Sequence, residues 1–196
     1  MVMTVLATDN FDRADEATLL APWGASGGGV AGFALSVNKA EPTGFGSNRA
    51  MIYTGINWPN DQYAQAKIRV VGGASSGGEG QGLRVRDQGS AIDTSYECVV
   101  NSAATNNVTI WKRVLGTITN LGFRTATWVD DDVLRMTVIG GDKTTIYLYQ
   151  NGVQIGAVFN ETNAILSGSP GLGFSSPTTS ASADDWEGGG DTTAIA

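Results

Sequence analysis

Four short segments carry aromatic or cationic side chains at alternate positions, and such side chains could bind sugars. Aromatic rings stack on the C–H faces of sugars, while arginine and lysine hydrogen-bond to hydroxyls and carboxylates. If the four segments form neighbouring strands, one polar groove would hold all of these side chains. An ordinary solvated sheet face, or an interface with another subunit, would explain the same pattern. The candidate carbohydrate-binding residues are Tyr63, Lys67, Arg69, Arg84, Arg86, Trp111, Arg113, Tyr147 and Tyr149.

Acidic residues gather near both ends of the chain and could bind a metal ion. Carboxylate oxygens are the ligands that Ca²⁺ prefers, so adjacent terminal strands would bring a calcium site together. Turns and helix caps are the alternative use of these residues, and Asp15 could begin a short helix. The clusters are Asp9, Asp12 and Asp15 near the start and Asp184, Asp185 and Glu187 near the end. The expected calcium ligands are Asp9, Asp12, Asp185 and Glu187.

The residues that are missing exclude several kinds of chemistry. The chain has no histidine, which excludes Ser-His-Asp and Cys-His catalysis. Cys98 is the only cysteine, so neither an intrachain disulfide nor a zinc-binding cysteine cluster can form. The net charge of −7 argues against nucleic-acid binding, which needs a basic surface. Apart from the possible calcium ion, we expect no cofactor.

We expect neither a membrane span nor a secretory signal. No apolar run approaches the ~18 residues that a spanning helix needs. The opening residues MVMTVLATDNF lack a cationic segment and a long enough apolar one. The sequence therefore predicts a protein made in the cytoplasm of its producing cell.

Composition and spacing predict an all-β domain. The chain has 196 residues, which suits one domain, and 27 of them are glycine, about twice the usual share. Short segments with period-two alternation follow one another about every ten residues, with turn residues between them. This pattern is typical of antiparallel sheets in a sandwich or barrel. We expect one domain over residues 1–187 and an extended tail over 188–196.

Three local features are expected in detail. Asn151-Gly152 between two alternating segments predicts a hairpin, because both residues tolerate positive φ. Residues 14–20 read as one or two helical turns. Cys98 is expected to pack inside the protein, as a small apolar side chain would.

Three longer motifs carry a resemblance to a known superfamily. They are DNFDRADEATLLAPWG (9–24), DVLRMTVIGGDKTTIYLYQNGVQIG (132–156) and GLGFSSPTTSASADDWEGG (171–189). Together they resemble the concanavalin A-like lectin/glucanase superfamily, including its laminin G-like jelly rolls. The resemblance implies a jelly-roll β-sandwich whose first and last strands lie side by side. Similar domains are frequent in tailed-bacteriophage virions, which implies a virion setting.

The resemblance leaves three functions open. The first is a non-enzymatic structural or attachment protein of a virion, with other virion proteins, further copies of itself or host glycans as partners. The second is a carbohydrate-binding, lectin-like module. The third is a polysaccharide-cleaving enzyme, in which Tyr63 with Arg84 or Arg86 would move a proton. The glucanase motif ExDxxE is missing from the sequence, so we expect no enzyme.

Overall fold

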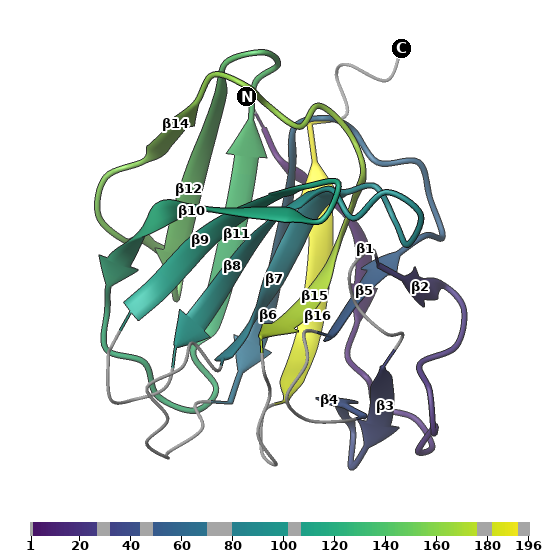
Figure 1. Ribbon diagram of the computed structural model, residues 1–196. Helices are drawn as coiled ribbons and strands as arrows, with labels where there is room; N and C mark the ends of the chain where they lie inside the picture. Colours follow the sequence, from purple (N-terminus) through teal and green to yellow (C-terminus); the bar gives the residue numbers. More distant parts are fainter. Residues whose placement is uncertain are drawn as a thin grey trace.

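The computed structural model describes residues 2–26, 32–43, 49–69, 80–101, 107–175 and 182–191. Throughout these ranges the regular structure is β-strand, and two antiparallel sheets lie one behind the other (Figure 1). The expected two-sheet β-sandwich is therefore confirmed. The described residues contain no helix that could cross a membrane.

The nine-stranded sheet, here called sheet A, has the order β13-β12-β11-β6-β16-β4-β3, with β1 beside β16 and β14 beside β12. Its strands are β1 (Thr4–Asp9), β3 (Phe33–Ser36), β4 (Lys39–Pro42), β6 (Gln62–Ile68), β11 (Val133–Ile139), β12 (Thr144–Gln150), β13 (Val153–Gln154), β14 (Phe159–Glu161) and β16 (Ala183–Gly190).

The seven-stranded sheet, here called sheet B, has the order β10-β9-β8-β7-β15-β5-β2. Its strands are β2 (Trp23–Ala25), β5 (Arg49–Tyr53), β7 (Gly80–Asp87), β8 (Ser95–Asn101), β9 (Asn107–Val114), β10 (Thr117–Thr125) and β15 (Ser169–Ser175). Apolar side chains at alternate positions of both sheets form one buried cluster between them.

Cys98 belongs to this cluster, as expected, and is fully buried. Burial raises the pKa of its thiol to about 12. Because the thiolate is the reactive form, the native protein at pH 8 should react with Ellman's reagent at least ~100-fold more slowly than the unfolded chain. Unfolding in guanidinium should release one reactive thiol per chain. Rapid labelling of the folded protein would contradict this burial.

The two ends of the described chain lie side by side. Strand β1 pairs antiparallel with β16, with Thr4 opposite Gly190 and Asp9 opposite Trp186. The expected tail therefore begins too early, because Gly188, Gly189 and Gly190 belong to the strand. An added Cβ at Gly188 would meet the rings of Trp58 and Trp186 at 2.7 Å, so glycine permits this close packing. Residues 192–196 of the tail lie outside the described residues.

The helix expected over residues 14–20 is wrong. Glu16 forms an isolated bridge with Leu35, and the amide of Leu19 donates to the carbonyl of Phe33. Pairing with β3 thus satisfies backbone groups that a helix would have paired locally. The hairpin at Asn151-Gly152 is confirmed: both residues have positive φ, 50° and 80°, and they join β12 to β13.

Candidate functional site

The structure divides eight of the nine predicted sugar-binding residues between the two sheets, and the ninth, Arg69, follows the end of β6. Strands β6 and β12 flank β11 in sheet A, whereas β7 and β9 flank β8 in sheet B. The prediction of a single groove is therefore wrong, because consecutive strands β6 and β7 belong to opposite sheets. Sheet A carries Tyr63, Lys67, Tyr147 and Tyr149, while sheet B carries Arg84, Arg86, Trp111 and Arg113.

Two rows of side chains cross the outer face of sheet A. In the first row Tyr63 of β6, Thr137 of β11 and Tyr147 of β12 lie opposite one another. In the second row Gln65 of β6, Arg135 of β11 and Tyr149 of β12 do the same. Alternation turns these side chains away from the core, because the residues between them are buried and apolar: Ala64, Ala66, Leu134, Met136, Val138, Ile146 and Leu148.

A hollow of about 310 Å³ lies on this face and is here called the sheet A groove. That volume falls at the small end of ligand sites, which span roughly 300–1,000 Å³. Both polar and apolar side chains line the groove: Met3, Gln65, Val133, Arg135, Thr137, Ile139 and Tyr149, with Gly152. The groove thus combines an aromatic ring, a cation and hydrogen-bonding groups.

Arg135 occupies the middle of the groove and rests on aromatic rings. Its guanidinium carbon lies 3.8 Å from the ring centre of Tyr63 and 5.9 Å from that of Tyr149. Its Nε donates to the hydroxyl of Thr137 at 3.2 Å. Tyr147 stacks beside Tyr149, with ring centres 6.4 Å apart. These contacts hold the guanidinium in one orientation, with its terminal nitrogens available to a ligand.

Tyr63 supports this arrangement from below. It is only 2% exposed, and its hydroxyl donates to Oε1 of Glu187 at 2.5 Å. Burial, followed by this bond and the charge of Glu187, raises the pKa of Tyr63, while Arg135 lowers it. The net effect is a rise in the pKa of Tyr63. The tyrosine therefore stays protonated, which argues against a role as a general base.

The two remaining predicted cations on this side lie apart from the groove. Lys67 pairs with Asp185, Nζ to Oδ2 at 2.5 Å, at an exposed position. Arg69 follows the end of β6 and is exposed. Neither residue lines the groove.

Arg84 and Arg113 are bound by internal acids on sheet B. Arg84 Nη2 lies 3.3 Å from Glu97 Oε2, and Arg113 Nε lies 3.1 Å from the same oxygen. Arg84 also pairs with Asp87 at 3.1 Å. Burial opposes the charge of Arg84, but Glu97 and Asp87 together raise its pKa. These two arginines are at most 5% exposed, which gives them a structural role rather than a ligand-binding one.

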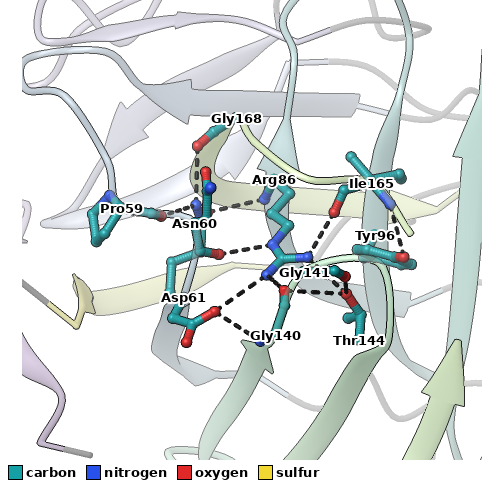
Figure 2. Close-up of polar contacts among 11 residues, drawn as sticks. Pro59, Asn60, Asp61, Arg86, Tyr96, Gly140, Gly141, Thr144, Ile165 and Gly168 are labelled. Atoms are coloured by element: carbon teal, nitrogen blue, oxygen red, sulfur yellow. Dashed lines mark hydrogen bonds and ion pairs between the residues drawn. The ribbon is translucent and has the colours of Figure 1, made fainter. Parts of the chain in front are cut away.

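Arg86 links the two sheets, as Figure 2 shows. From β7 in sheet B its guanidinium donates to the carbonyls of Asn60, Gly140 and Ile165 and to the hydroxyl of Thr144, at 2.6–2.9 Å. Gly140 and Thr144 belong to the β11–β12 hairpin of sheet A. Arg86 is fully buried and has no surface to offer a ligand. The enzyme alternative would have used Tyr63 with Arg84 or Arg86. These residues lie on different sheets and bind other partners: Tyr63 binds Glu187, Arg84 binds Glu97 and Arg86 binds Gly140.

Trp111 is the sheet B candidate that stays partly exposed. It lies opposite Glu97 of β8 and Asn120 of β10, on the outer face of its sheet. Arg113, next but one along β9, is buried beneath the surface. The cation predicted to act beside Trp111 is therefore buried and paired with Glu97, which leaves it unavailable to a ligand.

The terminal acids meet as expected, but they bind other partners. Asp9, Asp185 and Glu187 line one hollow of about 170 Å³. Asp9 accepts hydrogen bonds from Arg13 and from the indole of Trp23. Asp185 pairs with Lys67, and Glu187 accepts a hydrogen bond from Tyr63. Asp12 is exposed. Across the described ranges no three acidic side chains are placed to hold a metal ion.

Two charged residues beside the predicted ones were not predicted: the partly exposed Arg135 and the buried Glu97. Each lies on the middle strand between two predicted ones, Arg135 on β11 and Glu97 on β8. A sequence signal existed for Arg135, because it alternates with Leu134 and Met136 in a core strand. Only the strand order reveals that these positions face Tyr63 and Arg84.

Comparisons with known proteins identify the fold. No family model matches the sequence, and no curated protein matches it either. Among solved structures, the carbohydrate binding module CBM66 from Bacillus subtilis has a TM-score of 0.58 and 15% identity, over 88% of this chain and 99% of that one. The Emp47p carbohydrate recognition domain has a TM-score of 0.61 and 10% identity, over 94% of each chain.

A third similar structure is the VIP36 exoplasmic/lumenal domain in a Ca²⁺/Man3GlcNAc-bound form. Its TM-score is 0.53 and its identity 12%, over 85% of this chain and 83% of that one. At such low identity the likeness shows the fold alone, a jelly-roll sandwich of the lectin type. The resemblance seen in the end motifs is thereby confirmed at the level of fold.

Proposed function

We propose that this protein is a carbohydrate-binding, lectin-like module whose sugar site is the sheet A groove. One observation carries the proposal: Gln65, Arg135 and Tyr149 form a row across three neighbouring strands and line a hollow of about 310 Å³. Aromatic rings and convergent polar groups are what a sugar requires. The similar structures, which include a carbohydrate binding module and a carbohydrate recognition domain, support the proposal.

The proposal is binding without catalysis. Tyr63, the residue considered for proton transfer, contacts Arg135 from below rather than lining the groove, and its hydroxyl is held by Glu187. The raised pKa of Tyr63 supports a structural role for this residue. Adding EDTA or Ca²⁺ during the binding measurement would test the calcium prediction at the same time.

Replacing Tyr149 with alanine should weaken glycan binding about tenfold, which corresponds to ~1.4 kcal/mol. The ring is partly exposed and stacks with Tyr147, so its loss removes the aromatic wall of the groove. A glycan array followed by calorimetry on the bound sugar measures the change.

Trp111→Ala is the matched control, since it removes an aromatic ring from the outer face of the other sheet. Binding that survives Tyr149→Ala but disappears with Trp111→Ala would move the site to sheet B. Absence of any saturable binding by the wild-type protein would overturn the proposed function.

The virion setting stays a prediction, as do the virion partners and self-association. No comparison bears on them. Co-purification with particles, and the mass of the protein in solution, would test them directly.

A further inference from the structure

We infer that the sheet A groove selects anionic sugars, whose carboxylate or sulfate group binds Arg135. This inference rests on the proposed function and adds the chemical class of the ligand. Arg135 lies in the middle of the second row, between Gln65 and Tyr149. Its side chain is partly exposed, so a ligand can reach it.

The charge of Arg135 is unmatched within the described part of the chain. No carboxylate there lies within ion-pair distance of it, in contrast to Arg13, Arg84 and Arg113, which all pair with acids. Its one hydrogen bond runs from Nε to Thr137 and engages none of its terminal nitrogens. The two terminal nitrogens therefore keep their donors for an incoming group.

The neighbouring charges do not compete for Arg135. Glu187 accepts a hydrogen bond from the hydroxyl of Tyr63. Lys67 and Asp185 neutralise each other. Arg135 is thus the cation that the groove presents. The net charge of −7 on the whole chain acts at longer range, where physiological salt screens charges over about 8 Å.

The geometry favours an oxyanion over a neutral hydroxyl. A guanidinium presents parallel N–H donors that match two oxygens of one carboxylate or sulfate, and such charge-assisted bonds are about twice as strong as neutral ones. Stacking on Tyr63 at 3.8 Å already fixes the plane of the guanidinium. Little side-chain freedom is then lost when the ligand binds.

The test compares sugars that differ only in charge. Uronic-acid and sulfated oligosaccharides are measured by calorimetry beside their carboxyl-reduced and desulfated counterparts. We expect the wild-type protein to bind an anionic member at least tenfold more tightly than its neutral counterpart. The carboxylate and sulfate arms then tell which group the site takes.

Two variants test whether Arg135 causes the preference for anionic sugars. Arg135→Gln should abolish the preference, while Lys143→Gln should keep it. Lys143→Gln removes one positive charge from an exposed turn of the same hairpin and is the matched control. Thermal unfolding of both variants shows that they fold.

The outcomes separate this inference from the proposed function. Equal affinity of the wild-type protein for charged and neutral sugars would overturn the inference and leave the proposed function standing. A preference that survives in Arg135→Gln would overturn it too. Binding to no sugar of either kind would reject the proposed function itself.

Discussion

Replacing Arg86 with methionine should destabilise the protein by about 3–5 kcal/mol, the range expected when one member of a buried charged network is removed and its partners stay behind. The side chain donates to three carbonyls and to the Thr144 hydroxyl, and one nitrogen lies 3.5 Å from Asp61. Methionine fills much of the volume but leaves these acceptors unpaired in a buried place. The largest loss falls on the contacts between β7 and the β11–β12 hairpin, shown in Figure 2.

Thermal and urea unfolding measure this effect. For a chain of this size each kcal/mol lowers the Tm by roughly 2–4 °C, so a fall of roughly 10 °C is expected. The Tm of Arg86→Lys should lie between those of the wild-type protein and Arg86→Met, because one ammonium group cannot reach all of the acceptors. Lys143→Met removes an exposed charge from the same hairpin and should change stability by less than about 0.5 kcal/mol. Wild-type stability in Arg86→Met would mean that the carbonyl contacts do not hold the sheets together.

Replacing Trp186 with alanine should also cost about 3–5 kcal/mol, as for other large buried aromatic residues. Trp186 is 1% exposed. Its ring lies 4.9 Å from that of Trp23, 5.2 Å from Tyr53 and 6.2 Å from Trp58, measured between ring centres. Trp23 and Tyr53 belong to sheet B, whereas Trp186 belongs to β16 of sheet A. The substitution therefore opens a cavity where the terminal strands meet the opposite sheet.

Trp186→Phe provides the graded control. It keeps an aromatic ring and removes an indole N–H that has no hydrogen-bond partner among the described residues, so its cost should stay below about 2 kcal/mol. Urea unfolding gives the stability, and near-ultraviolet circular dichroism reports the loss of aromatic packing. If Trp186→Ala proved as stable as Trp186→Phe, the aromatic cluster would not be what joins the chain ends to the sandwich.

Much of the fold could be predicted from local patterns. Period-two alternation correctly predicted an all-β domain of short strands, among them β8 and β11, because an apolar residue at every second position must face a core. The Asn151-Gly152 hairpin was equally clear, since few residues accept positive φ. The helix at residues 14–20 was wrong because its backbone pairs with β3, a partner distant in sequence.

The glycines at the end of β16 also could not be predicted from local patterns. Gly188, Gly189 and Gly190 have neither side-chain pattern nor β-propensity, and they were assigned to a tail. They form strand because they pair with β1 and β6. Glycine is needed at these positions because Trp58, Tyr63 and Pro59 occupy the space where side chains would stand.

The candidate site, too, could be predicted only in part from the sequence. By itself the sequence determined which face of its strand most of the candidate residues occupy, because side chains alternate along a strand. It thereby placed Tyr147 and Tyr149 together on one face of their strand, and Tyr63 on one face of a different strand. Arg86 is an exception: its φ of 50° breaks the alternation of β7, and its guanidinium reaches Gly140 and Thr144 of the opposite sheet. Only the tertiary structure decided which strands are neighbours, because pairing between distant segments sets the strand order. That order put Arg135 between Gln65 and Tyr149, and it buried Arg84 and Arg86 among internal partners.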